Sequence, residues 1–320
     1  MSDFRIPLGS GAEIVIDFIT ETFGVVFDII RAIVNVAYEA VDAVLVLPPF
    51  WVIIAVFVAL ALAARGWKFA VGTAVGLVLI VGVDQWENAM DTLALVLVAS
   101  VITIAIAIPL GIVAAKSDLA SGIIRPILDF MQTMPAFVYL IPALILFRIG
   151  VVPGIVATII FALAPGVRLT ELGIRGVDRE VVEAGQAFGA SPRRILRQIQ
   201  LPLAMPTIMA GINQVIMLSL SMVVIAGMVG AGGLGGEVVK SLGRIDVALG
   251  FEAGLSVVIL AIILDRMTAA LGLPRRSVRR RTPEAEPTAA DPEAAPSGTA
   301  PVASVPAASA ADRAAEPAAV

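Results

Sequence analysis

The residues that could carry chemistry in this chain gather in one short polar and basic segment between long apolar runs. Its first half reads Glu183-Ala184-Gly185-Gln186-Ala187-Phe188-Gly189, and its second half ends in Ile199-Gln200-Leu201-Pro202. The chain contains no histidine and no cysteine, which removes the commonest metal ligand and general base, and all thiolate chemistry. The segment therefore indicates a docking element for a partner protein rather than an active site.

A helix, a glycine elbow and a second helix are predicted for this segment. The first helix is expected over about 179–188, with Asp178 as its N-cap and Gly189 at its end. One face of this helix is apolar and can press against a protein surface, and it is formed by Val181, Ala184 and Phe188. The second helix restarts at Ser191-Pro192, an N-cap followed by an N1 proline. Its apolar stripe is formed by Ile195, Leu196 and Ile199.

The spacing of these residues resembles the EAA loop of bacterial ABC importer permeases. The pattern Glu-Ala-x, three residues, Gly, nine residues, Ile-x-Leu-Pro is met by Glu183, Ala184, Gly189, Ile199, Leu201 and Pro202. One position departs, because Gly185 stands where the motif usually has alanine, and this change loosens the helix by up to ~1 kcal/mol. The resemblance implies that the loop inserts into a groove of a separate ATP-hydrolysing subunit and transmits its closure to the membrane helices.

The flanking sequence narrows the resemblance to the glycine betaine/proline permease subgroup, over roughly 50–271. The segments that carry it are 132–140, 160–163, 201–211 and 259–266. The resemblance implies a non-enzymatic permease for glycine betaine or a related quaternary ammonium compound or proline. It also implies a second permease copy, ATPase subunits and an extracytoplasmic solute-binding protein. No cofactor is expected in this chain, and ATP and Mg would be held by the ATPase subunit.

The composition places the chain in a bilayer. Hydrophobic residues make up 59% of the 320 residues, charged residues 15%, and the mean hydropathy is +0.97. Soluble proteins carry about 25% charged residues, so a soluble fold is excluded. We expect an all-α membrane protein with membrane lipid as a neighbour, and no nucleic acid partner.

Three regions are expected along the chain. Residues 1–47 are apolar but interrupted by charges, which predicts an amphipathic helix that either lies at the membrane interface or packs on the membrane domain. Residues 48–273 form the permease domain, with the coupling loop at 175–202. About seven spans are expected there, at 49–64, 69–83, 92–115, 128–147, 152–167, 203–229 and 247–271. Residues 274–320 are expected to be a basic anchor and a disordered Ala/Pro-rich tail.

Charge asymmetry predicts the orientation. With an odd number of spans, one side collects most of the basic residues, namely Arg65, Lys68, Lys116, Arg125, the six arginines from Arg168 to Arg197, and Arg275, Arg276, Arg279, Arg280 and Arg281. That side is cytoplasmic by the positive-inside rule. The N-terminus is then expected outside and the C-terminus in the cytoplasm, and the family resemblance implies the bacterial inner or plasma membrane as the location.

Four residues are candidates for the translocation pathway: Phe137, Tyr139, Asn213 and Met217. Aromatic rings attract quaternary ammonium cations, and Pro135 and Pro142 permit a bend near the first two. Core packing for the aromatic residues and helix–helix bonding for Asn213 remain open alternatives. Six glycines between Gly227 and Gly236 predict tight backbone approach or a hinge rather than a nucleotide loop.

The alternative function from another class is an ion-coupled secondary transporter or channel. Such a protein needs acidic residues or broken helices that hold ions at the membrane midplane. The central predicted spans lack such carboxylates, which counts against it. A non-transporting membrane scaffold is a weaker third possibility, which the polar residues of span 203–229 disfavour.

Overall fold

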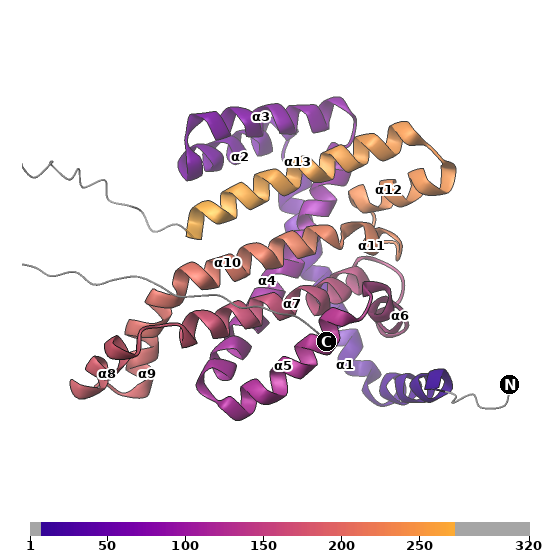
Figure 1. Ribbon diagram of the computed structural model, residues 1–320. Helices are drawn as coiled ribbons and strands as arrows, with labels where there is room; N and C mark the ends of the chain where they lie inside the picture. Colours follow the sequence, from indigo (N-terminus) through magenta and orange to yellow (C-terminus); the bar gives the residue numbers. More distant parts are fainter. Residues whose placement is uncertain (1–7, 273–320) are drawn as a thin grey trace, which may run out of the picture. The chain divides into compact units, whose positions relative to one another are not determined.

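The computed structural model describes residues 8–272, and every regular element within them is helical (Figure 1). The helices are α1 (Leu8–Val46), α2 (Phe50–Arg65), α3 (Trp67–Gly82), α4 (Trp86–Lys116), α5 (Asp118–Thr133), α6 (Ala136–Phe147), α7 (Val151–Arg175), α8 (Arg179–Ala187), α9 (Pro192–Ile195), the π-helical turn η1 (Leu196–Gln200), α10 (Leu201–Ser221), α11 (Val223–Gly227), α12 (Gly233–Arg244) and α13 (Val247–Gly272). The predicted all-α class is confirmed. The predicted tail at 274–320 lies outside the described residues.

Four helices of the described residues are long and apolar enough to cross a membrane, and six if each of two bent pairs is one span. The four are α4, α7, the run Pro192–Gly227 and Val247–Ala270 of α13. The predicted number of about seven is higher because it counted 49–64 and 69–83 as full spans. These segments are α2 and α3, with 16 residues each. A helix of that length is about 24 Å long, shorter than the ~30 Å hydrocarbon layer.

The predicted single span 128–147 is wrong in one respect, because the chain breaks there into α5 and α6. The two helices meet at an angle of 97°. Pro135 has no N–H to donate, and Met134 before it takes an extended conformation with ψ at 136°. The prolines were expected to permit a bend, and the bend is large enough to end one helix and begin another.

The N-terminal helix α1 is amphipathic, as predicted, and its two halves have different surroundings. The helix is interrupted at Phe23, which has non-helical angles. After this point α1 packs on α4, α6 and α7, with Val34 buried and the Phe27 and Phe147 rings 5.6 Å apart. Before it, Phe18 and its apolar neighbours are exposed. Of the two alternatives predicted for this segment, packing on the membrane domain applies to the second half of α1.

The core of the described chain is built around α7, which packs against α4 on one side and α10 on another. Small residues make these approaches close. A side chain on Gly166 of α7 would collide with Ala107 of α4, and Gly173 faces Ala204 at the start of α10. The hydrophobic effect does not drive helix association within lipid, so the association depends on van der Waals packing, which small residues permit by letting the backbones approach.

The glycines that follow α10 also serve close approach, as predicted. A Cβ on Gly227 would lie 2.3 Å from the backbone of Gly235, so α11 and α12 are in backbone contact. Gly233 has φ +60° and lies against Thr92 of α4, whose hydroxyl oxygen accepts a hydrogen bond from the N–H of Leu234 at 2.8 Å. These contacts fasten α12 to α4.

The α4–α7 contact gives the first prediction. A Cβ on Gly111 would lie 2.5 Å from the Cβ of Thr170 and 2.8 Å from the carbonyl oxygen of Val167. We expect Gly111→Ala to destabilise the purified protein by about 1–3 kcal/mol through overpacking. Thermal unfolding in detergent, followed by tryptophan fluorescence, measures this.

The matched control is Gly72→Ala in α3, where a Cβ meets no described atom within 4 Å. It should be neutral or slightly stabilising, because alanine is the better helix former. Equal stability of the two variants would contradict the proposed packing.

Candidate functional site

The docking segment begins with α8, which starts where the sequence predicts. The Asp178 carboxylate accepts a hydrogen bond from the N–H of Glu180 at 3.0 Å, which confirms Asp178 as the N-cap. Glu180 in the first turn lies near the positive end of the helix dipole. The cap fixes the start of α8, which is separated from the end of α7 by three residues.

The glycine elbow that ends α8 is a Schellman motif. Gly189 has φ +75°, its N–H donates to the carbonyl of Gln186 at 2.8 Å, and the N–H of Ala190 donates to the carbonyl of Gly185 at 3.1 Å. A Cβ on Gly189 would meet no atom of the described chain within 4 Å. The elbow therefore depends on a left-handed backbone angle rather than on close approach.

The second half of the segment is a continuous extension of a membrane span. α9 starts at Pro192 after Ser191, as predicted, and passes through η1 directly into α10. The π-helical turn was not predicted, since the sequence carries no local marker for it. Leu201 and Pro202 of the motif are the first residues of α10.

The two halves of the motif are in contact through Gly185. A Cβ on Gly185 would lie 2.7 Å from Cδ1 of Ile199, so the absence of a side chain lets Ile199 approach α8. Ile195 and Leu196 of the same stripe are buried, and Leu196 packs with Ile174 of α7. The departure from alanine at Gly185 thus has a packing reason.

The outward face of α8 is apolar and uncovered by the described chain. Val181, Ala184 and Phe188 are all exposed, and Phe188 is 92% exposed. α8 and α9 lie beyond the ends of α7 and α10 at the lower left of Figure 1. An exposed phenylalanine on a capped helix outside the membrane spans is suited to contact with another protein.

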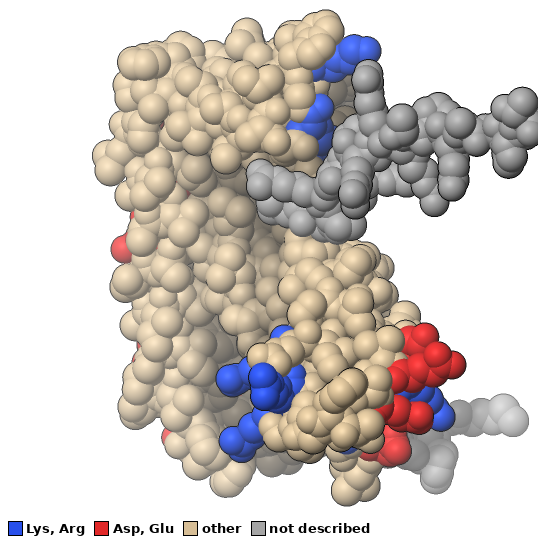
Figure 2. Space-filling model, turned by 90° about the vertical axis from the view of Figure 1, so that its left-hand side faces the viewer, with Lys and Arg blue, Asp and Glu red and all other residues tan. Residues whose placement is uncertain are grey.

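Charged side chains surround this apolar face. Figure 2 turns this side of the protein toward the viewer and shows acidic and basic side chains gathered in its lower part, with a few basic ones at the top. The exposed charged residues of α8, α9 and η1 are Arg179, Glu180, Glu183, Arg193, Arg194 and Arg197. Glu183 also lines a cavity of about 280 Å³ with Gln186 and Gln200.

The two aromatic candidates for the pathway lie on different sides of α6. Phe137 is exposed, whereas Tyr139 is buried and its hydroxyl donates to the carbonyl of Met134 at 3.3 Å. This carbonyl is at the break between α5 and α6, so Tyr139 satisfies a backbone group that the broken helix leaves free. The structure does not bring the two rings together.

Asn213 is bonded to another helix. Its amide nitrogen donates to a carboxylate oxygen of Asp265 at 3.0 Å, and its oxygen accepts from the hydroxyl of Thr268, both on α13. Met217, one turn on, is partly buried. The sequence did not reveal these partners, although Asp265 is an acidic residue within a predicted span and such residues are usually paired.

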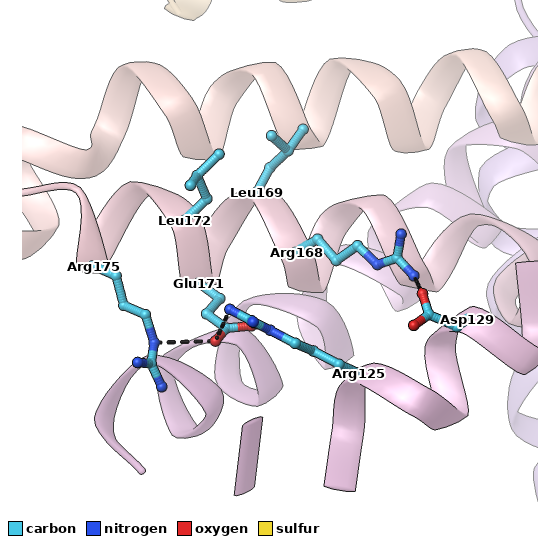
Figure 3. Close-up of a pocket in the computed structure, with 7 residues that line it drawn as sticks. All are labelled: Arg125, Asp129, Arg168, Leu169, Glu171, Leu172 and Arg175. Atoms are coloured by element: carbon cyan, nitrogen blue, oxygen red, sulfur yellow. Dashed lines mark hydrogen bonds and ion pairs between the residues drawn. The ribbon is translucent and has the colours of Figure 1, made fainter. Parts of the chain in front are cut away.

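A further group of charged residues, at the end of α7, was missed from the sequence. The carboxylate of Glu171, with its side chain 3% exposed, accepts hydrogen bonds from Ser121 and Arg125. It also forms an ion pair with Arg175, and Figure 3 shows the two arginines beside it. A signal was present, because α5 and α7 each carry acidic and basic residues at helical spacing within otherwise apolar sequence.

The comparisons with known proteins agree with this fold. The family model described as "Binding-protein-dependent transport system inner membrane component" matches residues 107–275. A solved chain of the MetNI methionine ABC transporter, in an inward-facing conformation, covers 59% of this chain and 94% of its own length with a TM-score of 0.54 and 22% identity. At that identity the likeness shows the fold alone.

Three curated relatives are similar over most of the chain. ProW of Escherichia coli (strain K12), a glycine betaine/proline betaine transport system permease protein, is 51% identical over 85% of this chain and 77% of its own length. GbuB of Listeria monocytogenes serotype 1/2a, a glycine betaine/carnitine transport permease protein, is 49% identical over 85% and 98%. OpuAB of Bacillus subtilis (strain 168), a glycine betaine transport system permease protein, is 46% identical over 85% and 97%.

The bonds of Asn213 give the second prediction. Asn213→Ala removes the amide that binds Asp265, and Thr268→Val removes the hydroxyl that binds Asn213, so each should cost about 1–2 kcal/mol of stability. The double variant should lose less than the sum, because the residues share one network. Thermal unfolding of the three variants measures this.

Gln214→Ala is the control, because Gln214 is an exposed polar residue next to Asn213 on α10. It should leave stability unchanged. Unchanged stability of Asn213→Ala together with a loss of uptake would instead favour a place for Asn213 in the pathway.

Proposed function

Because this chain belongs to the family of binding-protein-dependent transport system inner membrane components, we propose that it carries glycine betaine or a related quaternary ammonium compound or proline. The chain is the membrane permease subunit of an ABC importer. The proposed solute is supported by the 46–51% identity, over 85% of the chain, to three permeases whose names specify glycine betaine. Family membership also sets aside the ion-coupled secondary transporter.

The loop formed by α8, α9 and η1 is proposed as the docking element for a separate ATPase subunit. Its apolar face, with Val181, Ala184 and Phe188, has no cover from the described chain, and Glu183 adds a charge beside it. Gly189 provides the turn and Ile199 holds the second half against α8. Leu201 and Pro202 join the loop to α10, so displacement of the loop reaches a span directly.

ATP would then act on this chain only through its partner. ATP and Mg are proposed to bind the ATPase subunit, which closes as a pair and moves two coupling loops, one from each of two permease copies. A solute-binding protein delivers cargo on the outer side. The permease contributes two conformations, and nucleotide binding contributes the difference in affinity that shifts their populations.

The proposed orientation has the N-terminus outside and the C-terminus in the cytoplasm. The turn between α2 and α3, the loop with α8 and α9, and the end of α13 lie on the same side in Figure 1. These segments contain the basic residues Arg65, Lys68 and Arg193 among others. The positive-inside rule assigns that side to the cytoplasm.

Of the four proposed pathway residues, Phe137 is the one with an exposed ring. An exposed ring beside the break between α5 and α6 could face a quaternary ammonium cation. Tyr139, Asn213 and Met217 are buried or partly buried, and the first two already have hydrogen-bond partners. Their proposed contribution is therefore to the shape of the path rather than to direct contact.

The docking proposal gives the third prediction. Gly189→Leu forces a side chain into φ +75°, which costs about 1–2 kcal/mol, and Glu183→Lys reverses a charge at the docking face. Both variants should insert normally and lose about 90% or more of glycine betaine uptake and of substrate-stimulated ATP hydrolysis, because each tenfold change needs only ~1.4 kcal/mol.

The control is Gly189→Asn, because asparagine tolerates the left-handed conformation better than leucine. It should retain most of the uptake. Normal uptake by Gly189→Leu at wild-type membrane levels would refute the idea that this loop transmits ATP energy.

The orientation gives the fourth prediction. Single cysteines can be placed at Ser191 and Asp84, since the chain has none of its own. An impermeant thiol reagent added to intact cells should label position 84 and spare position 191, and opening the cells should expose both. Labelling of position 191 with protection of position 84 would reverse the proposed topology.

A further inference from the structure

The cytoplasmic half of α7 and the helix α5 are joined by three ion pairs in a row. The pairs are Asp118–Arg175, Arg125–Glu171 and Asp129–Arg168, with the α5 residue first. As the numbers rise along α5 they fall along α7, so the two helices are antiparallel here. We refer to these six residues as the charge ladder.

The middle pair has the strongest geometry. Arg125 binds the Glu171 carboxylate with two nitrogens, at 3.3 Å from Nε and 2.9 Å from Nη2, and Ser121 donates to the same carboxylate at 2.7 Å. The Nε of Arg175 forms an ion pair with the same carboxylate at 3.1 Å, and its Nη2 donates to the carbonyl of Ala114 near the end of α4. A buried carboxylate with this many donors holds three helices at one point.

The order of charges makes the ladder specific for one register. Along α5 the signs are negative, positive, negative, and along α7 from Arg175 back to Arg168 they are positive, negative, positive. A shift of α5 toward the end of α7 would place Arg125 against Arg175 and Asp129 against Glu171. Like charges in contact oppose such a shift, in either direction.

Apart from the ladder, α5 is attached to α4 and α7 by apolar packing, in which Ile124 and Met131 are partly buried beside Leu128. Its buried residue Leu128 packs with Ala107, Ala164 and Val167. On its other face Leu119, Ile123, Ile127 and Phe130 are exposed. Apolar packing alone does not distinguish one register from the next, so the ladder is the element that makes the position of α5 along α7 specific.

The ladder also lies between the two parts of the protein that transport has to connect. Arg175 is the last residue of α7, four positions before α8 begins. At its other end α5 leads across the 97° bend into α6 and Phe137. The docking loop, formed by α8, α9 and η1, is joined to α7 through α8, and the ladder is the polar connection from α7 to α5.

We propose that the charge ladder keeps α5 in register with α7, so that displacement of the docking loop moves the bent α5–α6 pair as one body. Glu171 is the positioning residue at its centre. This inference rests on the proposed function of the loop formed by α8, α9 and η1. It adds a second route into the membrane domain, beside the direct connection of that loop to α10.

The pair Asp129–Arg168, at the end of the ladder nearer α6, is the best place to test this proposal. Both side chains are partly exposed, and they line a cavity of about 360 Å³ (Figure 3). Reversed charges can therefore be accommodated there without overpacking. The variants are Asp129→Arg, Arg168→Asp and the double exchange, with Arg65→Asp as an exposed control outside the ladder.

The readout is the amount of radiolabelled glycine betaine taken up per ATP hydrolysed in proteoliposomes that contain the whole transporter. Each single reversal should lower this ratio about fivefold or more while ATP hydrolysis continues, and the double exchange should restore it to within about twofold. Arg65→Asp should leave it unchanged. The proposal would be overturned if the single reversals gave the same uptake per ATP as Arg65→Asp, or if the double exchange did not restore this ratio.

A distance measurement tests the proposed role of the ladder independently of which solute is transported and which partner binds the loop. Spin labels at Leu119 of α5 and Leu172 of α7, both exposed, should keep one distance with and without ATP in the whole transporter. The distance should spread in the single reversals and narrow again in the double exchange. If the distance between the two labels changes on ATP binding in the otherwise wild-type transporter, the proposed role of the ladder is wrong. If the wild-type transporter does not take up glycine betaine, only the proposed solute is wrong.

Discussion

The close packing of α7 against α4 and α10 is the constraint on which the rest of the described chain depends. In a bilayer the apolar side chains gain nothing from leaving lipid, so helices associate only where their backbones can approach and their polar groups can pair. Gly166 and Gly173 supply that approach, toward Ala107 and Ala204. Because α7 is held along its length, its last residue Arg175 has a fixed place and the N-cap Asp178 follows three residues later, so both α5 and α8 are positioned from there.

The loop formed by α8, α9 and η1, the proposed docking loop, is built differently on its two sides. On one side α8 is a short separate helix, limited by the cap at Asp178 and the left-handed turn at Gly189. On the other side α9 and η1 continue into α10 without an interruption. Ile199 against Gly185 closes the loop between them. A loop that is capped, closed by a side-chain contact and continuous with a span can transmit displacement, whereas a flexible loop of the same length would absorb it.

Much of this was accessible from the sequence, and the parts that were not have a physical reason. Helix caps are local, so Asp178, Gly189 and Pro192 predicted the elements of the docking loop correctly. Hydropathy located the apolar helices but not their geometry, since the 97° bend at Pro135 depends on how α6 packs back on α7. The partners of Glu171 and Asn213 are separated by about 50 residues, and no local pattern specifies which helices meet.

The polar groups inside the membrane domain show how far a residue type alone can indicate function. An asparagine or glutamate in a span is costly and must pair, so its presence predicts a polar contact but not whether that contact is with cargo or with another helix. Asn213 pairs with Asp265 and Thr268, and Glu171 with Ser121 and two arginines. Both residues therefore join helices, and a helix joined by paired charges moves with its neighbour. In an importer of the proposed kind, with ATP hydrolysis on a separate subunit, such connections would be the permease's own contribution: they would decide which helices move with the proposed docking loop.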